Sequence, residues 1–437
     1  MRKHQTDKRI FIATFILVLI GTIMVSIIGP SYTNIQNIAY GRNDDPNQTF
    51  KSQILYVVLA FLVMIVFLRM PLSKLGINEK GSHKWQSKLM KSLPEIMMWG
   101  SLVISLVMML SAKFYKLPFV GCALGACRWL NLGFLQLQVA ELVKFGSLFY
   151  FAKICTECRE TGGFERKEGA RKIVARRPAG YAGSKNIMQN STNRGSGSVG
   201  GKMKKIIKDL RQRKDGYVFW VKFLVPLGAA VFFLVVAQKD LGSALPLVAI
   251  ALAILLVSGA EIKSFLILVI CGLIFAGLAM VVSPHRQERL KGFLEGSSSN
   301  AYHINNALIA IGSGGLFGVG IGNNVQTAGY LPESITDSMF AVIGETIGFA
   351  GILIVLLFYY MLLSRILKVA DCTRNSFYQL VAVGIFAWLA GHVVVNITAM
   401  TGLVPLTGIT LPLLSKGGTS LILNMAIIGL VLNISQY

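Results

Sequence analysis

Long apolar stretches, separated by shorter charged segments, dominate the chain. About 20 apolar residues in helical form match the thickness of a bilayer's hydrocarbon core. Backbone groups in lipid must be hydrogen-bonded within their own segment, so such stretches are expected to be helices. We therefore predict an all-α, polytopic membrane protein with about ten membrane-spanning helices. The predicted spans are residues 10–28, 53–68, 96–112, 130–154, 218–236, 241–259, 264–282, 338–363, 377–399 and 419–434.

Positive charge is distributed unequally between the two sets of loops that these spans define. The chain has 437 residues, with 43 Lys and Arg against 20 Asp and Glu, and a formal net charge of +23. If the N-terminus lies in the cytoplasm, 30 of the Lys and Arg residues fall on the cytoplasmic side and 10 on the outside. This bias predicts that both termini are cytoplasmic. It also attributes the basic excess to orientation and anionic lipid rather than to nucleic acid.

Two of the loops are unusually long. Segment 155–216 is a cytoplasmic insert with 16 basic and 6 acidic residues, and its Gly/Ser-rich part at 190–202 is typical of a solvated linker. A basic helix on the membrane surface is the alternative for its C-terminal part. The extracytoplasmic loop 283–337 contains an apolar, glycine-rich stretch at 304–322, which predicts a short helix followed by a re-entrant turn. We expect one membrane domain over residues 1–437.

The six cysteines indicate little metal chemistry. Cys155 and Cys158 form a single CxxC on the cytoplasmic side, and no second pair of ligands follows nearby, as a zinc site would need. We therefore predict no metal site. Cys122 and Cys127 lie on the outer side, where they could form a disulfide, although nothing in the sequence requires it.

A few charges fall inside the predicted spans. Glu141 and Lys144 lie three residues apart in span 130–154, on one face of a helix and close enough to pair. A charge in a membrane is costly, so the two residues are either functional or a neutralised structural pair. Glu345 lies in span 338–363 without an evident partner.

Other charges collect on the outer face. These residues are Arg128, Asp240, Arg286, Arg289, Glu333, Asp337 and Lys416. Asp337 directly precedes span 338–363, so a favourable charge at a helix N-terminus is one explanation for it. A carboxylate base surrounded by cations at a membrane surface would also suit a phosphate-bearing, lipid-linked substrate. The same pattern would equally suit a proton-coupled transporter.

Four motifs give the chain a resemblance to a known family. They are GACRWLNLGFLQLQVAELVKF at 125–145, QKDLGSAL at 238–245, ALIAIGSGGLFGVGIGNNVQTAGYLPESITDSMFAVIGETIGFAG at 307–351 and PLTGITLPLLSKGGTSLI at 405–422. In content and order they resemble the motifs of the SEDS family of peptidoglycan glycosyltransferases (FtsW, RodA and SpoVE). The resemblance covers nearly the whole chain except the basic insert, and the wording around LPE is most similar to FtsW.

The chain departs from the family pattern at several positions. Ile335 replaces the usual His, Ser338 replaces Phe, and Thr346 replaces the second Glu of an IGEE motif. Lys239 replaces Pro, and Lys416 replaces a common Tyr. None of these changes removes the acid before the eighth span.

The resemblance implies an SEDS-type fold and a glycosyltransferase that polymerises lipid II at the outer face of the bacterial cytoplasmic membrane, in cell division. The reaction would join the 4-hydroxyl of an acceptor GlcNAc to C1 of a donor MurNAc, with undecaprenyl diphosphate as leaving group. Asp337 matches the family's essential acid and is the expected general base. The alternatives are a lipid II flippase, in which Glu141, Lys144 and Glu345 would matter most, and a non-catalytic scaffold for division proteins.

The expected substrate contacts follow from position and resemblance together. They are Arg128, Glu141, Lys144, Asp240, Arg286, Arg289, Glu333, Ser415 and Lys416. The cations among them would stabilise the charge of the leaving diphosphate. A divalent cation such as Mg²⁺ or Mn²⁺ could assist, although the sequence offers no dedicated cage for one. The expected partners are lipid II, a class B penicillin-binding protein and other division proteins.

Overall fold

The computed structural model confirms the all-α prediction. It describes residues 6–41, 43–70, 84–113, 119–123, 126–131, 133, 136–161, 199–282, 287 and 299–436. The helices are α1 (Lys8–Tyr40), α2 (Gln48–Arg69), α3 (Lys84–Lys113), α4 (Val139–Glu160), α6 (Val199–Phe232), α7 (Leu241–Ser258), α8 (Ile262–Val282), α10 (Ser299–Ser313), α11 (Met339–Cys372), α12 (Ser376–Met400) and α13 (Gly418–Ile434). The structure also contains two π-helical turns, η3 (Phe233–Ala237) and η4 (Gln326–Tyr330).

Each predicted span corresponds to one of these helices. Within the described part of the chain, seven helices are long and apolar enough to cross a membrane, and α8 and α13 contribute shorter apolar stretches. Helix α4 is less apolar because Glu141, Lys144 and Lys153 interrupt it. The protein is therefore a multi-pass membrane protein.

The predicted fourth span begins too early. Residues 130–138 were expected to be helical, but the chain forms a small antiparallel sheet before α4 begins at Val139. Its strands are β1 (Val120–Ala123), β2 (Ala126–Asn131) and β3 (Gln136–Gln138). The physical reason is visible in the sequence LQLQ at 135–138, which alternates with the period of a strand. A disulfide joins Cys122 to Cys127 across the β1–β2 hairpin.

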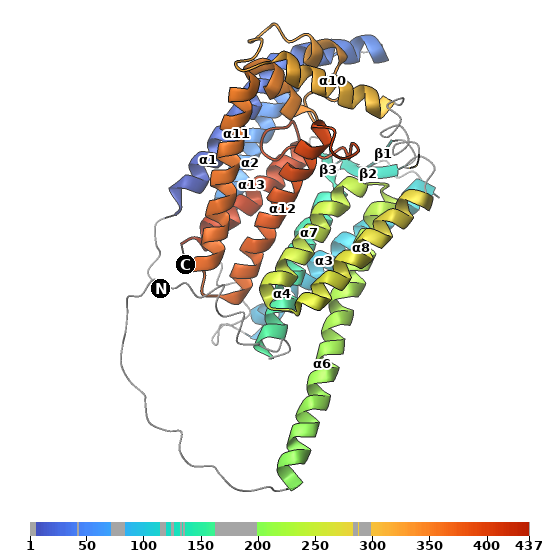
Figure 1. Ribbon diagram of the computed structural model, residues 1–437, viewed down its shortest axis with the longest axis vertical. Helices are drawn as coiled ribbons and strands as arrows, with labels where there is room; N and C mark the ends of the chain where they lie inside the picture. The colour runs from blue at the N-terminus through green and yellow to red at the C-terminus, as the bar shows by residue number, and fades with distance from the viewer. Residues whose placement is uncertain are drawn as a thin grey trace.

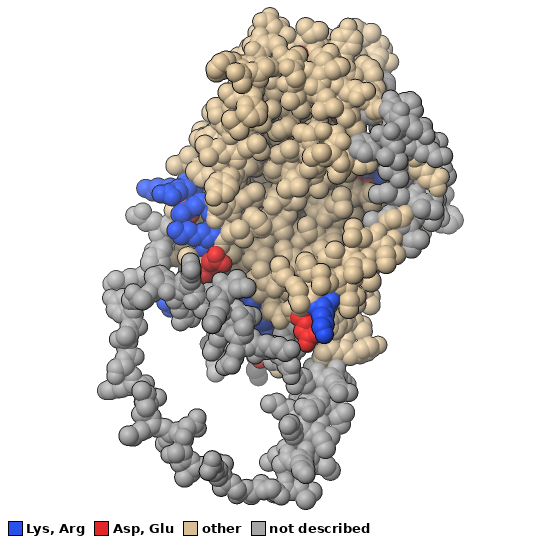
Figure 2. Space-filling view, in the orientation of Figure 1, with Lys and Arg blue, Asp and Glu red and all other residues tan. Residues whose placement is uncertain are grey.

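The helices pack side by side into one bundle (Figure 1). Helix α13 lies along α2, and α12 lies along α7. Close approach depends on small residues: a Cβ added to Gly429 of α13 would overlap the carbonyl oxygen of Met64 in α2. The face drawn in Figure 2 has Lys, Arg, Asp and Glu mainly toward the end that carries the chain termini, and its middle is uncharged. This distribution fits a surface surrounded by lipid.

Contacts along α1 separate the two ends of the bundle by a distance that matches the thickness of a bilayer. Near one end of α1, the backbone nitrogen of Asp7 donates to Ser435 Oγ at 3.3 Å, which places the two chain termini on the same side. Toward the other end, Tyr32 donates to the carboxylate of Glu333 at 3.5 Å. The helical segment from Asp7 to Tyr32 is about 37 Å long at about 1.5 Å per residue. The turn that holds Glu333 therefore lies across a membrane from the termini, which the charge bias assigns to the cytoplasm.

A glycine-rich turn docks on the backbone of α11. The short helix expected within loop 283–337 is α10, and the turn at 314–322 follows it directly. Val319 N donates to Glu345 O at 2.9 Å, and Phe349 N donates to Gly315 O at 2.9 Å. These bonds flank Gly348, whose φ of 77° interrupts the helix. The turn thus replaces part of the helical hydrogen bonding of α11.

We expect Gly348→Ala to destabilise the protein. A Cβ at Gly348 would collide with Gly318 N and the Leu316 carbonyl, and its positive φ strains any other residue. The two effects together should lower the free energy of unfolding by at least about 2 kcal/mol, measured as a lower melting temperature in detergent. Gly312→Ala in α10 is the control, because nothing lies within 4 Å of its added Cβ. Equal melting temperatures for the two variants would contradict the docking role.

Candidate functional site

Asp337 lies at the outer end of the bundle, where three segments meet. It is the second-to-last residue of the turn 331–338 that leads into α11. Asn396 of α12 donates through Nδ2 to Asp337 O at 2.7 Å and to Ile409 O at 2.6 Å, so it ties this turn to the loop before α13. In that loop, a Cβ added to Gly408 would lie 3.5 Å from Asp337 Oδ2. The absence of a side chain at Gly408 therefore leaves space beside the carboxylate.

Asp240 occupies the third segment, between η3 and α7. Its carboxylate caps α7 by accepting from Ser243 N at 2.9 Å and from Ser243 Oγ at 2.7 Å. Gln138, just before α4, also donates to it through Nε2 at 3.4 Å. A Cβ at Gly242 would meet Thr407 O at 2.5 Å, so α7 lies directly against the loop before α13. The Asp240 turn and the Asp337 turn are thus joined through one loop.

Arg128 of β2 holds the Asp240 turn in place. Its Nε donates to Gln238 O at 2.8 Å and its Nη2 donates to Lys239 O at 3.2 Å. Lys239, which directly precedes Asp240, has a φ of 53°, in the left-handed region. Two charge-assisted bonds to the turn compensate for this unfavourable backbone conformation.

The surroundings of Asp337 change the pKa of its carboxyl group. Burial raises the pKa of the Asp337 carboxyl to about 7, and the negative charges of Glu333 and Asp240 add to this effect. A buried carboxylate is destabilised by loss of hydration, and nearby like charges oppose its ionisation further. A carboxyl group that titrates near neutral pH at the end of a membrane bundle is suited to exchange a proton.

Glu333 lies in the same turn as Asp337, and Lys416 contacts that turn. Glu333 has a φ of 47° and accepts from Thr336 Oγ1 at 2.9 Å. Lys416 donates from its backbone nitrogen to Ile335 O at 2.8 Å, and its Nζ lies 3.4 Å from Thr49 Oγ1. No carboxylate among the described residues pairs with Lys416. Burial lowers the pKa of its ammonium group, so a nearby anion would stabilise the charged form.

Ser415 has a local structural partner. Its Oγ is buried and accepts from Leu411 N at 2.9 Å, which closes the turn before α13. Arg286 and Arg289, the other two cations of the sequence prediction, lie outside the described residues.

Glu141 and Lys144 form an ion pair inside the bundle. Lys144 Nζ lies 2.7 Å from Glu141 Oε1 and 2.9 Å from Nε2 of His392 in α12. His392 Nδ1 lies 2.8 Å from Trp388 O, and because a carbonyl only accepts, Nδ1 carries the proton and Nε2 accepts from Lys144. Gln138, one turn before Glu141, contacts Asp240, so this buried cluster lies just below the outer site.

Glu345 has a backbone partner that its sequence position did not reveal. Its two carboxylate oxygens accept from Gln326 N at 2.9 Å and Thr327 N at 2.8 Å, at the beginning of η4. The carboxylate therefore satisfies two backbone donors at the start of a helical turn. Its neighbour Thr346 accepts from Asn324 Nδ2 at 2.6 Å, which fixes the same loop.

The family comparison agrees with these features. The family model for FtsW, RodA and SpoVE, described as cell cycle protein, matches residues 7–175 and 203–437. The chain belongs to the FtsW/RodA/SpoVE family. The expected family resemblance is thereby confirmed.

Individual FtsW/RodA/SpoVE relatives cover most of the chain. The probable peptidoglycan glycosyltransferase FtsW of Coxiella burnetii is 30% identical, over 73% of this chain and 73% of the relative. The probable peptidoglycan glycosyltransferase FtsW of Haemophilus influenzae is 29% identical over 98% of this chain and 90% of its own. A chain of a solved peptidoglycan synthase complex, described for its coordination of polymerization and crosslinking, has the same fold. Its TM-score is 0.64 at 19% identity, over 98% of this chain and 97% of that one.

His303 is a member of the site that sequence reasoning missed. From α10, its Nε2 lies 2.6 Å from Ser338 Oγ, next to Asp337, and Ser338 Oγ donates to Pro332 O at 3.1 Å. Burial lowers the pKa of His303, while the charge of Glu333 opposes that effect. The available signal was the departure of Ile335 and Ser338 from the FtsW/RodA/SpoVE pattern, which puts a small hydroxyl where His303 can reach it.

We expect Asp337→Asn to be more heat-resistant than the wild type at pH 8. The pKa of Asp337 is about 7 in the folded protein against an ordinary 3.8, so the folded state holds this proton more tightly. The contribution of this group to stability is therefore greatest below about pH 4 and declines as the pH rises to about 7. Asparagine removes that decline.

The measurement is the melting temperature of both proteins in detergent at pH 8 and at pH 4. The advantage of the variant should shrink toward pH 4. Asp44→Asn, at an exposed outer position, is the control. A pH-independent difference between Asp337→Asn and the wild type would show that burial of the charge is not the cause.

Proposed function

We propose that this chain is a peptidoglycan glycosyltransferase of the FtsW type, which polymerises lipid II at the outer face of the bacterial cytoplasmic membrane in cell division. The observation that carries the proposal is the carboxyl group of Asp337, whose pKa of about 7 suits proton exchange at the outer end of the bundle. The names of the FtsW relatives support an enzyme of this type.

Asp337 is the proposed general base. Its ionised form accepts the proton of the acceptor's GlcNAc 4-hydroxyl as that oxygen bonds to C1 of the donor MurNAc. The bond from C1 to the diphosphate oxygen breaks, and its electron pair leaves with undecaprenyl diphosphate. A pKa near the working pH provides both a sufficient ionised fraction and adequate basicity. The space beside Gly408 gives the hydroxyl access to the carboxylate.

Lys416 and Arg128 are the proposed partners of the leaving diphosphate. Lys416 carries a partly desolvated charge without a carboxylate partner among the described residues, so an incoming anion would stabilise it. Arg128 uses two of its N–H groups on backbone carbonyls and keeps others free for an anion. Arg286 and Arg289 remain proposed contacts from the sequence alone.

Asp240, Glu333 and Ser415 then support the base rather than replace it. Asp240 and Glu333 raise the pKa of Asp337, and Ser415 shapes the loop that carries Lys416. Glu141 and Lys144 are proposed to support the Asp240 turn from within the bundle, because Gln138, one turn before Glu141, donates to Asp240. The described residues contain no group of three or more His, Cys, Asp or Glu side chains that could hold a metal ion. No step is therefore assigned to Mg²⁺ or Mn²⁺.

The arrangement of charges favours the glycosyltransferase over a flippase. A flippase needs a hydrated polar path through the bundle, and Glu141, Lys144 and Glu345 were the expected members of such a path. Their exposed fractions are 4%, 0% and 2%, and each is held by an ion pair or by backbone donors. Buried charges that already have partners are poorly suited to bind a polar headgroup as it crosses the membrane.

A class B penicillin-binding protein is the proposed partner in crosslinking the new strands, together with other division proteins. The fold likeness to a chain of a complex that coordinates polymerization and crosslinking supports this assembly.

We expect Asp337→Asn to lose glycan polymerisation. Removal of a general base should reduce the rate by about 10² to 10⁴-fold while the fold is retained. The assay uses the purified protein with its transpeptidase partner and labelled lipid II, and the polymer is read on a gel. Asp44→Asn, an exposed carboxylate on the same side, should polymerise like the wild type. Wild-type activity in Asp337→Asn would overturn the mechanism, and lipid II movement across vesicles without polymer would favour the flippase.

We expect polymerisation to rise with pH through about 7, because only ionised Asp337 accepts a proton. Glu333→Gln should move this rise to lower pH, since it removes a negative charge that opposes the ionisation of Asp337. The measurement is the pH profile of kcat/KM for both proteins. A profile that keeps its midpoint in Glu333→Gln would contradict the assignment of the rise to Asp337.

A further inference from the structure

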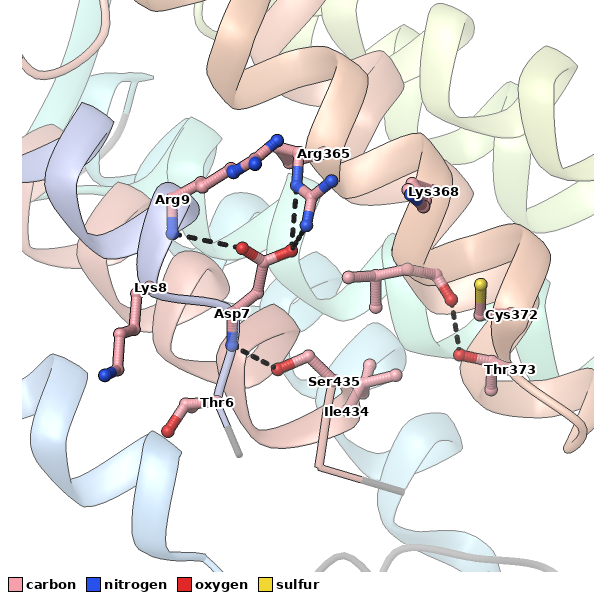
Figure 3. Close-up of a pocket in the computed structure, with 11 residues that line it drawn as sticks. Thr6, Asp7, Lys8, Arg9, Arg365, Lys368, Cys372, Thr373, Ile434 and Ser435 are labelled. Atoms are coloured by element: carbon pink, nitrogen blue, oxygen red, sulfur yellow. Dashed lines mark hydrogen bonds and ion pairs between the residues drawn. The ribbon is translucent and has the colours of Figure 1, made fainter. Parts of the chain in front are cut away.

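A second polar site lies at the other end of the bundle from Asp337. A cavity of about 550 Å³ opens between the beginning of α1, the end of α11 and the end of α13 (Figure 3). Its charged lining residues are Asp7, Lys8, Arg9, Arg365 and Lys368. This end carries the chain termini, which the charge bias assigns to the cytoplasm.

One ion pair fixes the walls of this cavity. Asp7 Oδ2 lies 2.7 Å from Arg365 Nη2 and 2.9 Å from Arg365 Nε. The backbone nitrogen of Asp7 donates to Ser435 Oγ at 3.3 Å, and Asp7 Oδ1 accepts from Arg9 N at 3.0 Å. Asp7 therefore joins α1, α11 and α13, and the cavity is formed before any ligand enters.

The remaining cations of the cavity have no counter-ion among the residues that the structure describes. The single carboxylate is used by Arg365, and Lys8, Arg9 and Lys368 pair with no carboxylate of the described residues. Four cations against one carboxylate leave a formal excess of three positive charges. Figure 2 shows Lys and Arg gathered at this end of α1 and α11, and in Figure 3 the side chain of Arg9 extends toward Arg365. The cavity can therefore surround an anion with several N–H donors.

The sequence places these cations at the depth of lipid headgroups. Lys8 and Arg9 directly precede the apolar run that begins at Ile10. Arg365 follows the apolar run of α11, and Lys368 lies one turn further along the same helix. Cations at the ends of spans lie where the hydrocarbon core meets water.

The cavity also has an apolar wall. Val369 and Ile434 line it beside the cations, and Leu367 on the same turn of α11 is an exposed apolar residue. A soluble phosphate compound would use only the cationic part of such a site. A phospholipid would use both parts, because its phosphate and its first acyl carbons lie next to each other.

We propose that this cavity binds the phosphate headgroup of an anionic lipid of the cytoplasmic leaflet. The lipid phosphate accepts from Lys8, Arg9 and Lys368 and offsets part of their positive charge, and its acyl chains extend along α11. The Asp7–Arg365 ion pair holds the walls of the site in place and stays intact when the lipid binds. This inference does not depend on the glycosyltransferase proposal.

The test is native mass spectrometry of the full chain in detergent, titrated with phosphatidylglycerol or with zwitterionic phosphatidylcholine. Lys8→Ala/Lys368→Ala should bind the first phosphatidylglycerol roughly 25-fold more weakly, since each basic residue near a membrane surface contributes roughly a fivefold change in affinity. Lys263→Ala, an exposed cation at the beginning of α8, should bind it like the wild type. The affinity for phosphatidylcholine should be the same for the wild type and both alanine variants.

Two further measurements make the outcome decisive. Lys8→Arg/Lys368→Arg should retain the lipid, because it keeps the charges, and this separates loss of the site from loss of the fold. Inorganic pyrophosphate is added in competition to distinguish a soluble source of phosphate. Equal phosphatidylglycerol binding by the alanine variant and the wild type would overturn the proposal. Displacement of the lipid by equimolar pyrophosphate would overturn its assignment to lipid.

Discussion

The outer site depends on the hydrogen bonds that the backbone of α11 makes where the helix is interrupted. A membrane offers no water to backbone groups, so a helix that breaks at Gly348 needs other donors and acceptors at once. The turn at 314–322 supplies them, and it approaches closely enough that a Cβ on Gly314 would overlap the carbonyl of Gly344. Glu345 completes the arrangement by accepting from the first two N–H groups of η4. The beginning of α11, and with it Asp337, is therefore held by a loop that precedes it in the chain.

Two polar clusters in this apolar bundle differ in how their charges are compensated. The Glu141–Lys144–His392 cluster is sealed and internally paired, so its charges largely cancel. At Asp337 the opposite holds: three carboxylates share one region, and within the described part of the chain no cation forms an ion pair with them. Like charges placed close together are unfavourable for stability, and proteins commonly accept such a cost where chemistry requires it. The contrast separates a structural cluster from a reactive one within the same few turns of helix.

The sequence predicted the spans well because a run of apolar residues is a local property. It failed at residues 130–138, where apolar content suggested a helix but Gln136–Gln138 form a strand. It also predicted that Glu141 and Lys144 could pair, since three residues along a helix define a distance. His303, His392 and Asn396 were not predicted, because each acts on a residue at least 30 positions away or on another helix. The neighbours of Glu345 were hidden for a further reason: they are backbone groups, which carry no side-chain signal.

The long helix α6 has a mechanical consequence. Figure 1 shows it extending beyond the bundle on the side of the chain termini, and it continues through η3 to end three residues before Asp240. One stiff rod therefore connects the cytoplasmic insert to a carboxylate on the opposite membrane face. Helices resist bending over such lengths far better than loops do, apart from the local weakness at Pro226. A torque applied to the cytoplasmic end would be carried along this helix, past Pro226, to the turn that Arg128 clamps.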